Sequence, residues 1–327
     1  MSYVAPLSKI FHLTEAGFGA AALDVFRFQH AHNPLYRRFC DLVRPDGVAA
    51  FGQIPFLPIS FFKTERVVCG AFEPALVFES SGTTGAATSR HYVKDAALYD
   101  TAAFTAFERL YGPLKGLRIL ALLPSYLERG QSSLVHMVQR FMDRSSHPGS
   151  GFFLHDHEAL AASLRAGEAA GERTLLIGVT YALLDFAAAH PMPLSHTIVM
   201  ETGGMKGRRR ELLRSEVHAA LRQAFDLPAV HSEYGMTELL SQAYARAEGV
   251  FETPSWLRAF VAEEDDPAAW SSAPGRTGRL CVMDLANYYS CSFIATEDIA
   301  RMQEGNRFEV LGRMDHTDVR GCSLLAL

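Results

Sequence analysis

A short run of glycine, serine and threonine residues contains the densest set of possible phosphate ligands in the chain. It follows the apolar run 75–78, which we interpret as a strand, and consists of Ser80, Ser81, Gly82, Thr83, Thr84 and Gly85. Glycine lets the backbone turn sharply, and successive N–H groups in such a turn bind anions. The hydroxyl groups add donors. The run predicts a polyphosphate site, although ordinary surface loops share this composition and the Gly-Lys-Ser/Thr ending of a Walker A loop is absent.

Three further segments follow this run in the chain. They are 232–238 (Ser-Glu-Tyr-Gly-Met-Thr-Glu), 296–298 (Thr-Glu-Asp) and 312–315 (Gly-Arg-Met-Asp). Together with the phosphate run, and in this order, they resemble the adenylate-forming superfamily of acyl-CoA synthetases, luciferases and peptide-synthetase adenylation domains. Any one of these segments alone would be a weak signal, whereas their common order over most of the chain is specific.

Within that superfamily the closest resemblance is to the LuxE-type acyl-protein synthetases, through segments 202–207, 232–241 and 320–323. The resemblance implies that ATP activates a carboxylic acid, fatty or aryl, and that the acyl group then passes to a thiol. The implied acceptor is the chain's own Cys322, a carrier protein, a partner enzyme or CoA. Two alternatives remain open: an aryl-CoA ligase like the phenylacetate-CoA ligases, and a non-catalytic nucleotide-binding subunit that needs a partner.

The same resemblance assigns roles to residues in the matched segments, with ATP and Mg²⁺ as cofactors. The phosphate run would hold the β- and γ-phosphates, Glu238 would bind Mg²⁺, and Thr237 would contact the α-phosphate. The adenine would stack on Tyr234, and Asp298 would accept hydrogen bonds from the ribose hydroxyls. Three glycines and an arginine of these motifs are assigned to the nucleotide site as well: Gly203, Gly204, Gly235 and Arg313.

The chain departs from the superfamily pattern in two ways. Arg90 stands where many members carry a lysine after the phosphate run, and its guanidinium suits phosphate oxygens. The sequence also ends 12 residues after Asp315, so we expect no C-terminal domain with its catalytic lysine. Lys206 could steer the substrate carboxylate instead, or it could simply face solvent at a helix start. Cys322 could carry the acyl group, or it could be a small apolar residue that docks the terminus.

Composition limits the class of protein. The 327 residues are 48% hydrophobic and 20% charged, as in globular proteins. A net charge of −5 argues against general nucleic-acid binding. We expect no membrane span and no signal sequence, and the five cysteines without a Cys-x-x-Cys pair fit a reducing, cytoplasmic compartment. His155 and His157 would share one face of a strand with Asp156 on the other, and no further ligand cluster lies nearby in the sequence, which disfavours zinc. A partner protein or a homo-oligomer is left open.

The periodicity of the apolar residues predicts an α/β class, with mostly parallel, layered sheets, flanking helices and a small β subdomain near the C-terminus. We expect an adenylating core over 1–253, which begins with a helical segment broken at Pro34, and the β subdomain over 254–327. Residues 254–274 are expected to form a solvated connection. Strands are predicted at 75–78, 118–123, 174–178, 197–201, 279–284, 290–295 and 307–311, and helices at 20–32, 95–111, 133–143, 158–170 and 206–224.

Overall fold

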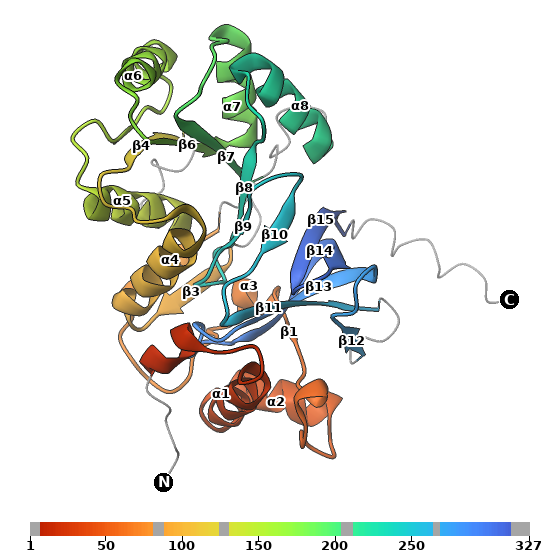
Figure 1. The fold of residues 1–327 in the computed structure, drawn as a ribbon. Helices are drawn as coiled ribbons and strands as arrows, with labels where there is room; N and C mark the ends of the chain where they lie inside the picture. The colour runs from red at the N-terminus through yellow and green to blue at the C-terminus, as the bar shows by residue number, and fades with distance from the viewer. Residues whose placement is uncertain (1–6, 81–87, 124–130, 204–211, 264–268, 315–327) are drawn as a thin grey trace, which may run out of the picture.

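The computed structural model describes residues 7–80, 88–123, 131–203, 212–263 and 269–314, arranged as Figure 1 shows. Within these ranges the strands form two sheets. The hairpin β2 (Leu76–Glu79) and β3 (Arg90–Val93) is the small one. The large one has 13 strands in the order β12-β11-β13-β14-β15-β10-β9-β8-β7-β6-β4-β5, with β1 joined to β14. The predicted α/β class is confirmed.

One half of the large sheet is parallel and lies between helices. Its strands are β4 (Arg118–Leu122), β5 (Gly151–Phe152), β6 (Thr174–Val179), β7 (Thr197–Thr202) and β8 (His231–Tyr234). Its helices are α4 (Ala96–Tyr111), α5 (Ser133–Ser145), α6 (His157–Ala170), α7 (Thr180–Ala189) and α8 (Arg214–Phe225). In Figure 1, α4 and α5 lie on one side of these strands and α7 and α8 on the other. Every residue of β4 and β6 is buried, as expected for parallel strands covered on both faces.

The other half of the sheet is antiparallel. Its strands are β9 (Ala243–Ala245), β10 (Val250–Glu252), β11 (Leu257–Ala262), β12 (Trp270–Ser271), β13 (Thr277–Asp284), β14 (Phe293–Gln303) and β15 (Arg307–Arg313). Strand β8 pairs in parallel with β7 and antiparallel with β9, so it stands at the junction of the two halves. Ligands of open α/β sheets commonly bind beyond the carboxyl ends of strands where the topology changes. The segment 234–238 lies at such an end.

The N-terminal segment packs against the antiparallel half. It contains η1 (Leu7–His12), α1 (Phe18–His32), α2 (Pro34–Val43), η2 (Phe51–Gln53), β1 (Leu57–Pro58) and α3 (Phe61–Thr64). The expected break before Pro34 is confirmed, because α1 ends at His32, but the loop expected after it is wrong. Pro34 is the first residue of α2, and the Asn33 side chain caps that helix by accepting from the Tyr36 N–H. Proline fits a first helical turn, where its missing N–H has no partner to lose.

The expected solvated connection at 254–274 is also wrong within the described residues. Strand β11 occupies 257–262 and pairs with β13 along its whole length. Phe260 of β11 is buried, and its ring centroid lies 4.5 Å from that of Trp270. The prolines and acidic residues that suggested solvent exposure flank this strand and do not interrupt it. The division proposed at residue 253 stays a prediction.

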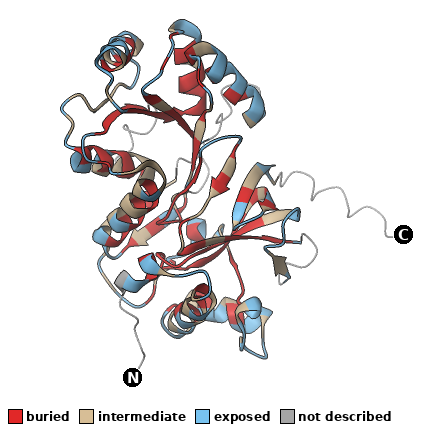
Figure 2. Ribbon diagram, viewed as in Figure 1, coloured by how far each residue is buried: buried red, intermediate tan, exposed pale blue. Residues whose placement is uncertain are grey.

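Other element boundaries differ by several residues from those predicted from the sequence. Strand β14 begins at Phe293, where a strand was expected from 290, and it continues to Gln303. Helix α8, expected from Lys206, begins at Arg214, and residues 204–211 lie outside the described part. Figure 2 shows that burial follows the sheet, whereas the outer helix faces are exposed. In the described ranges, none of the helices combines the length and apolarity that a bilayer crossing would require.

Candidate functional site

Three residues assigned to the nucleotide site meet at the junction of the two half-sheets. Tyr234 ends β8, Asp298 lies within β14, and Arg313 ends β15 directly opposite Asp298 in the β14–β15 register. The Tyr234 hydroxyl donates to Asp298 Oδ2 at 2.7 Å, and Arg313 Nε donates to Asp298 Oδ1 at 3.3 Å. The structure therefore brings together side chains that are up to 79 residues apart in sequence (313 minus 234).

The chemistry of this trio suits a ligand that donates hydrogen bonds. Burial and the Asp298 carboxylate raise the pKa of Tyr234 well above its usual value, so its hydroxyl keeps its proton. The Tyr234 ring packs on Phe251 and Phe308, with centroids 5.6 and 5.3 Å away. Each oxygen of a carboxylate can accept a second hydrogen bond. Asp298 thus retains acceptor capacity for a vicinal diol.

Glu238 is almost fully buried and lies within electrostatic reach of Arg313, a member of this trio. Burial raises its pKa, while the Ser89 hydroxyl and the positive charges of Lys63 and Arg313 oppose that rise. The Asn287 amide donates to the Glu238 backbone carbonyl at 2.7 Å and so holds the backbone in place. A buried carboxylate with a raised pKa would gain from a divalent cation beside it.

Oxygen ligands of this kind fit Mg²⁺, which protein sites often bind through one or two carboxylates plus substrate phosphates. Glu238 is the predicted carboxylate. In the part of the chain that the structure describes, no group of three or more His, Cys, Asp or Glu side chains could hold a metal by itself. Asp156 caps helix α6, and His157 is the first residue of that helix.

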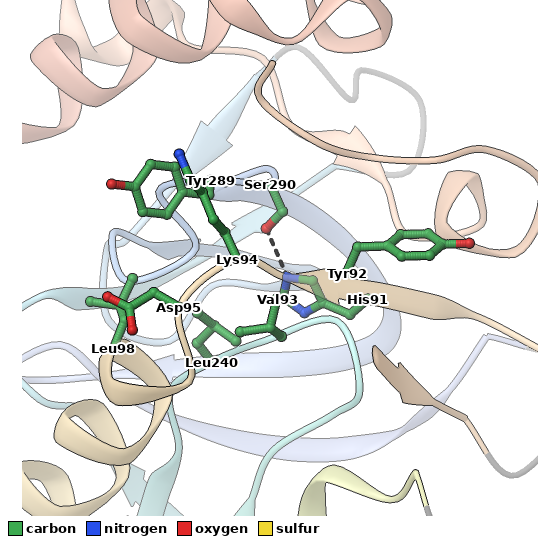
Figure 3. A pocket seen from close by; sticks show the side chains of 9 residues that line it. All are labelled: His91, Tyr92, Val93, Lys94, Asp95, Leu98, Leu240, Tyr289 and Ser290. Carbon is green, nitrogen blue, oxygen red and sulfur yellow. Dashed lines mark hydrogen bonds between the residues drawn. The ribbon is translucent and has the colours of Figure 1, made fainter. Parts of the chain in front are cut away.

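His91 connects the β2–β3 hairpin to the loop after β8. Its Nδ1 lies 3.0 Å from the Thr237 carbonyl oxygen and its Nε2 lies 2.8 Å from Ser290 Oγ, a contact drawn in Figure 3. The carbonyl can only accept, so Nδ1 carries the proton and Nε2 accepts from Ser290. Burial lowers the pKa of His91 to about 4. The sequence contained His91 beside the phosphate run but gave no sign of this contact.

Ser80, the first residue of the phosphate run, forms two hydrogen bonds with Ser89, which follows the run. Ser80 N donates to the Ser89 carbonyl at 3.0 Å, and Ser89 N donates to Ser80 Oγ at 2.9 Å. Ser81, Gly82, Thr83, Thr84 and Gly85 lie outside the described residues. Arg90 donates to Glu79 across the hairpin at 3.0 Å and is more than half exposed. Its predicted contact with phosphate stays a prediction.

Gly203 follows β7, beside the end of β8. Its φ of 72° lies in the left-handed region that favours glycine, and the Thr180 hydroxyl donates to its carbonyl at 2.6 Å. This conformation explains the glycine and fits the close approach expected of a flat base. Gly204, Lys206 and Cys322 lie outside the described residues, so their assigned roles stay predictions.

A buried polar network beneath this turn was not predicted from the sequence. Glu201, within β7, accepts from Arg214 Nε at 3.1 Å and from the Thr180 hydroxyl at 3.1 Å. Burial opposes its charge, but His218 and Arg214 outweigh burial and hold the pKa of Glu201 below its usual value. An acidic residue inside an otherwise apolar strand was the available signal, because a buried charge requires partners.

Comparison with known proteins gives a match in structure only. No protein-family model and no curated protein sequence matches the chain. Among solved structures, a 2-hydroxyisobutyryl-CoA ligase in complex with R3-HIB-AMP superposes with a TM-score of 0.67 at 11% identity, covering 92% of this chain and 68% of that one. A long-chain-fatty-acid-CoA ligase from Archaeoglobus fulgidus gives 0.51 at 13%, covering 74% and 52%.

An O-succinylbenzoate coenzyme A synthetase from Bacillus subtilis, in complex with AMP, gives a TM-score of 0.50 at 16% identity, covering 74% of this chain and 50% of that one. This chain thus spans about half the length of the last two structures. At such low identity the comparison establishes the fold. The chain has the mixed α/β fold of the acyl-CoA ligases.

Proposed function

We propose that the chain uses ATP and Mg²⁺ to activate a carboxylic acid, fatty or aryl, as an acyl adenylate and then transfers the acyl group to a thiol. The observation that carries this proposal is the meeting of Tyr234, Asp298 and Arg313 beside the buried Glu238. One cluster offers acceptors for a ribose, and the adjacent carboxylate offers a ligand for a cation. Acid activation by ATP needs both functions at one strand end.

In the proposed reaction, a carboxylate oxygen of the acid forms a bond to the α-phosphorus of ATP. The bond from that phosphorus to the bridging oxygen breaks, and pyrophosphate leaves. A bound Mg²⁺ would neutralise charge on the phosphoryl oxygens, which is the main requirement of such displacements. Asp298 would orient the ribose, Glu238 would hold the cation, and Thr237 would donate a hydrogen bond to the α-phosphate. The backbone of Thr237 is fixed by His91.

The thiol acceptor is the second half of the proposal. Cys40, Cys69, Cys281 and Cys291 are buried, and burial raises the pKa of the first three to about 12. Because the thiolate is the nucleophile, these four are poor acyl acceptors. The LuxE-type hypothesis therefore requires that the acyl acceptor is Cys322 or the thiol of a carrier protein or partner enzyme.

CoA is the alternative acceptor. It is favoured by a second structure of 2-hydroxyisobutyryl-CoA ligase, whose complex contains 2-HIB-AMP and CoA and which superposes with a TM-score of 0.62. Replacing a protein thiol by CoA would change the second step of the reaction but not the first. Supplying each thiol class in turn after adenylate formation distinguishes the two.

The first step can be tested by ATP–pyrophosphate exchange with a panel of fatty and aryl acids. We expect Mg²⁺-dependent exchange with at least one acid, and a loss of about a hundredfold or more in Glu238→Gln, because charge neutralisation by the metal is worth several kcal/mol. The matched control is Glu252→Gln, since Glu252 forms a surface ion pair with Arg246. Absence of exchange with every acid, with or without thiols, would contradict the proposal and favour the nucleotide-binding subunit.

A further inference from the structure

Glu233 has a buried carboxylate to which the proposed chemistry assigns no role. It lies opposite Thr202 of β7 and Tyr244 of β9 in the strand register, so these three side chains point to the same face of the sheet. The Thr202 hydroxyl donates a hydrogen bond to Glu233 Oε2. Tyr234 projects from the opposite face, toward Asp298. Glu233 thus lies on the other face of β8 from Tyr234, which is part of the nucleotide trio.

The carboxylate also contacts the loop that carries the proposed phosphate and metal ligands. A Cβ added at Gly235 would lie 2.4 Å from Glu233 Oε1 and 3.4 Å from Gln242 Cγ. Glu233 and Gln242 therefore both lie against the backbone of Gly235. This glycine begins the loop that ends at Glu238, so the position of the Glu233 carboxylate bears on that loop.

One of the two side chains that lie against Gly235, Gln242, has an acceptor atom that lacks a hydrogen-bond donor. Gln242 is 3% exposed, and its Oε1 is a buried side-chain atom without a hydrogen-bond partner in the described ranges. Such orphaned acceptors are rare because they cost free energy. Glu233 is the other side chain that lies against Gly235. When protonated it has an O–H group that could donate to the Gln242 oxygen, whereas an ionised Glu233 offers acceptors only.

The titratable groups that face Glu233 favour protonation. They are Glu201 of β7, Tyr99 of α4 and Tyr244 of β9, and no cation among the described residues lowers the pKa of Glu233. Burial and the charge of Glu201 raise that pKa to about 7, against the hydrogen bond from Thr202. Glu233 therefore gains or loses its proton near neutral pH.

We propose that Glu233 is a positioning residue: a proton taken up from solvent lets its carboxyl donate to Gln242 Oε1, and this bond fixes the 235–238 loop for ATP. The inference rests on the proposed nucleotide site. The negative charges of ATP disfavour an ionised carboxylate behind the loop. Because coupling between two binding events is reciprocal, protonation should strengthen ATP binding and ATP binding should take up protons.

Calorimetry of Mg-ATP binding to the full chain, in two buffers of different ionisation enthalpy, tests this coupling. If ATP raises the pKa of Glu233 by about one unit, the wild-type Kd increases about fivefold from about pH 6 to pH 8, and about 0.4 proton is taken up near pH 7. Glu233→Gln should remove the pH dependence and the uptake, because its amide cannot titrate. Glu252→Gln, a surface control, should keep both.

A second variant keeps the test valid if Glu233→Gln fails to fold. Gln242→Met removes the acceptor for the Glu233 proton, so the midpoint of the pH dependence should move to lower pH. An unmoved midpoint, or proton uptake that persists in Glu233→Gln, would overturn this inference and leave the proposed function intact. Failure of the wild-type chain to bind ATP at any pH would instead overturn the nucleotide site, and this inference with it.

Discussion

At the scale of single residues, Asp298 has one exposed partner and one buried partner. Its partner Arg313 is largely exposed, with 78% of the side chain accessible, and exposed ion pairs contribute little stability. The other partner, the Tyr234 hydroxyl, is part of the buried sheet junction. We therefore expect the Arg313–Asp298 pair to orient the carboxylate, and the main effect of losing it to appear in nucleotide binding.

We predict that Asp298→Ala weakens ATP binding by about 1–3 kcal/mol, the usual loss for hydrogen bonds to a charged group. Calorimetric titration with Mg-ATP measures this change. Tyr234→Phe is the matched variant, because it removes one hydrogen bond to Asp298 and keeps the ring between Phe251 and Phe308; a smaller loss is expected there. Unchanged affinity in Asp298→Ala would mean that Asp298 is misassigned.

At the scale of elements, the β2–β3 hairpin is attached to the site by a histidine. His91, in β3, joins the carbonyl of Thr237 to Ser290 in the connection between β13 and β14. The two ring nitrogens therefore link three segments of the chain. Since His91 is buried and its pKa is lowered to about 4, this link depends on the neutral ring.

That dependence gives a prediction for stability against pH. A histidine of ordinary pKa in the unfolded chain binds its proton near pH 6.5, whereas folded His91 binds it near pH 4. The unfolded state thus takes up more protons in this window, and stability is lost as pH falls through it. Between about pH 7 and pH 5 the wild-type chain should lose about 2 kcal/mol more than His91→Gln.

Urea unfolding at several pH values measures this difference. Glutamine keeps one donor and one acceptor but does not titrate, so the comparison isolates the histidine proton even if the variant is less stable overall. His231, whose pKa is also lowered to about 4 by burial, is present in both proteins and cancels. If the free energies of unfolding of the two proteins changed in parallel with pH, His91 would not be a neutral, buried histidine in the folded protein.

At the scale of the whole molecule, each of the two half-sheets contributes residues to the candidate site. The parallel half supplies the strand end after β8, and the antiparallel half supplies Asp298 and Arg313. The four described cysteines lie in the interior of this assembly. A covalent acyl intermediate on the chain itself is therefore proposed at Cys322.

We predict that incubation with ATP and the acid substrate gives an acyl adduct that hydroxylamine removes and that Cys322→Ser prevents. Mass spectrometry of the intact protein detects this adduct. As a control, a neutral thiol reagent should leave the four buried cysteines unmodified in the native protein, because burial keeps them protonated, and should modify all five after unfolding. An equal adduct in Cys322→Ser, or turnover with CoA and no adduct, would instead indicate a different acceptor.

Much of the fold could be predicted from the sequence. Buried parallel strands such as β4, β6 and β7 contain apolar runs, and capped amphipathic helices such as α5 have a regular period. Strand β11 and helix α2 could not be predicted in this way. Their flanking prolines and charges suggested loops, and only pairing with β13, or the cap at Asn33, decides otherwise.

The candidate site, too, could be predicted from the sequence only in part. The sequence by itself determined the residue types and their order, because a phosphate run, a Tyr-Gly-Met-Thr-Glu segment and a later Asp are local patterns. Only the tertiary structure decided that Tyr234 donates a hydrogen bond to Asp298, since that contact joins β8 to β14, two strands that are not paired with each other and whose two residues are 64 apart in the sequence. The setting of Glu233 is likewise tertiary. Its raised pKa comes from burial and from Glu201 on the neighbouring strand, and no local pattern encodes which side chains surround a residue once the sheet has formed.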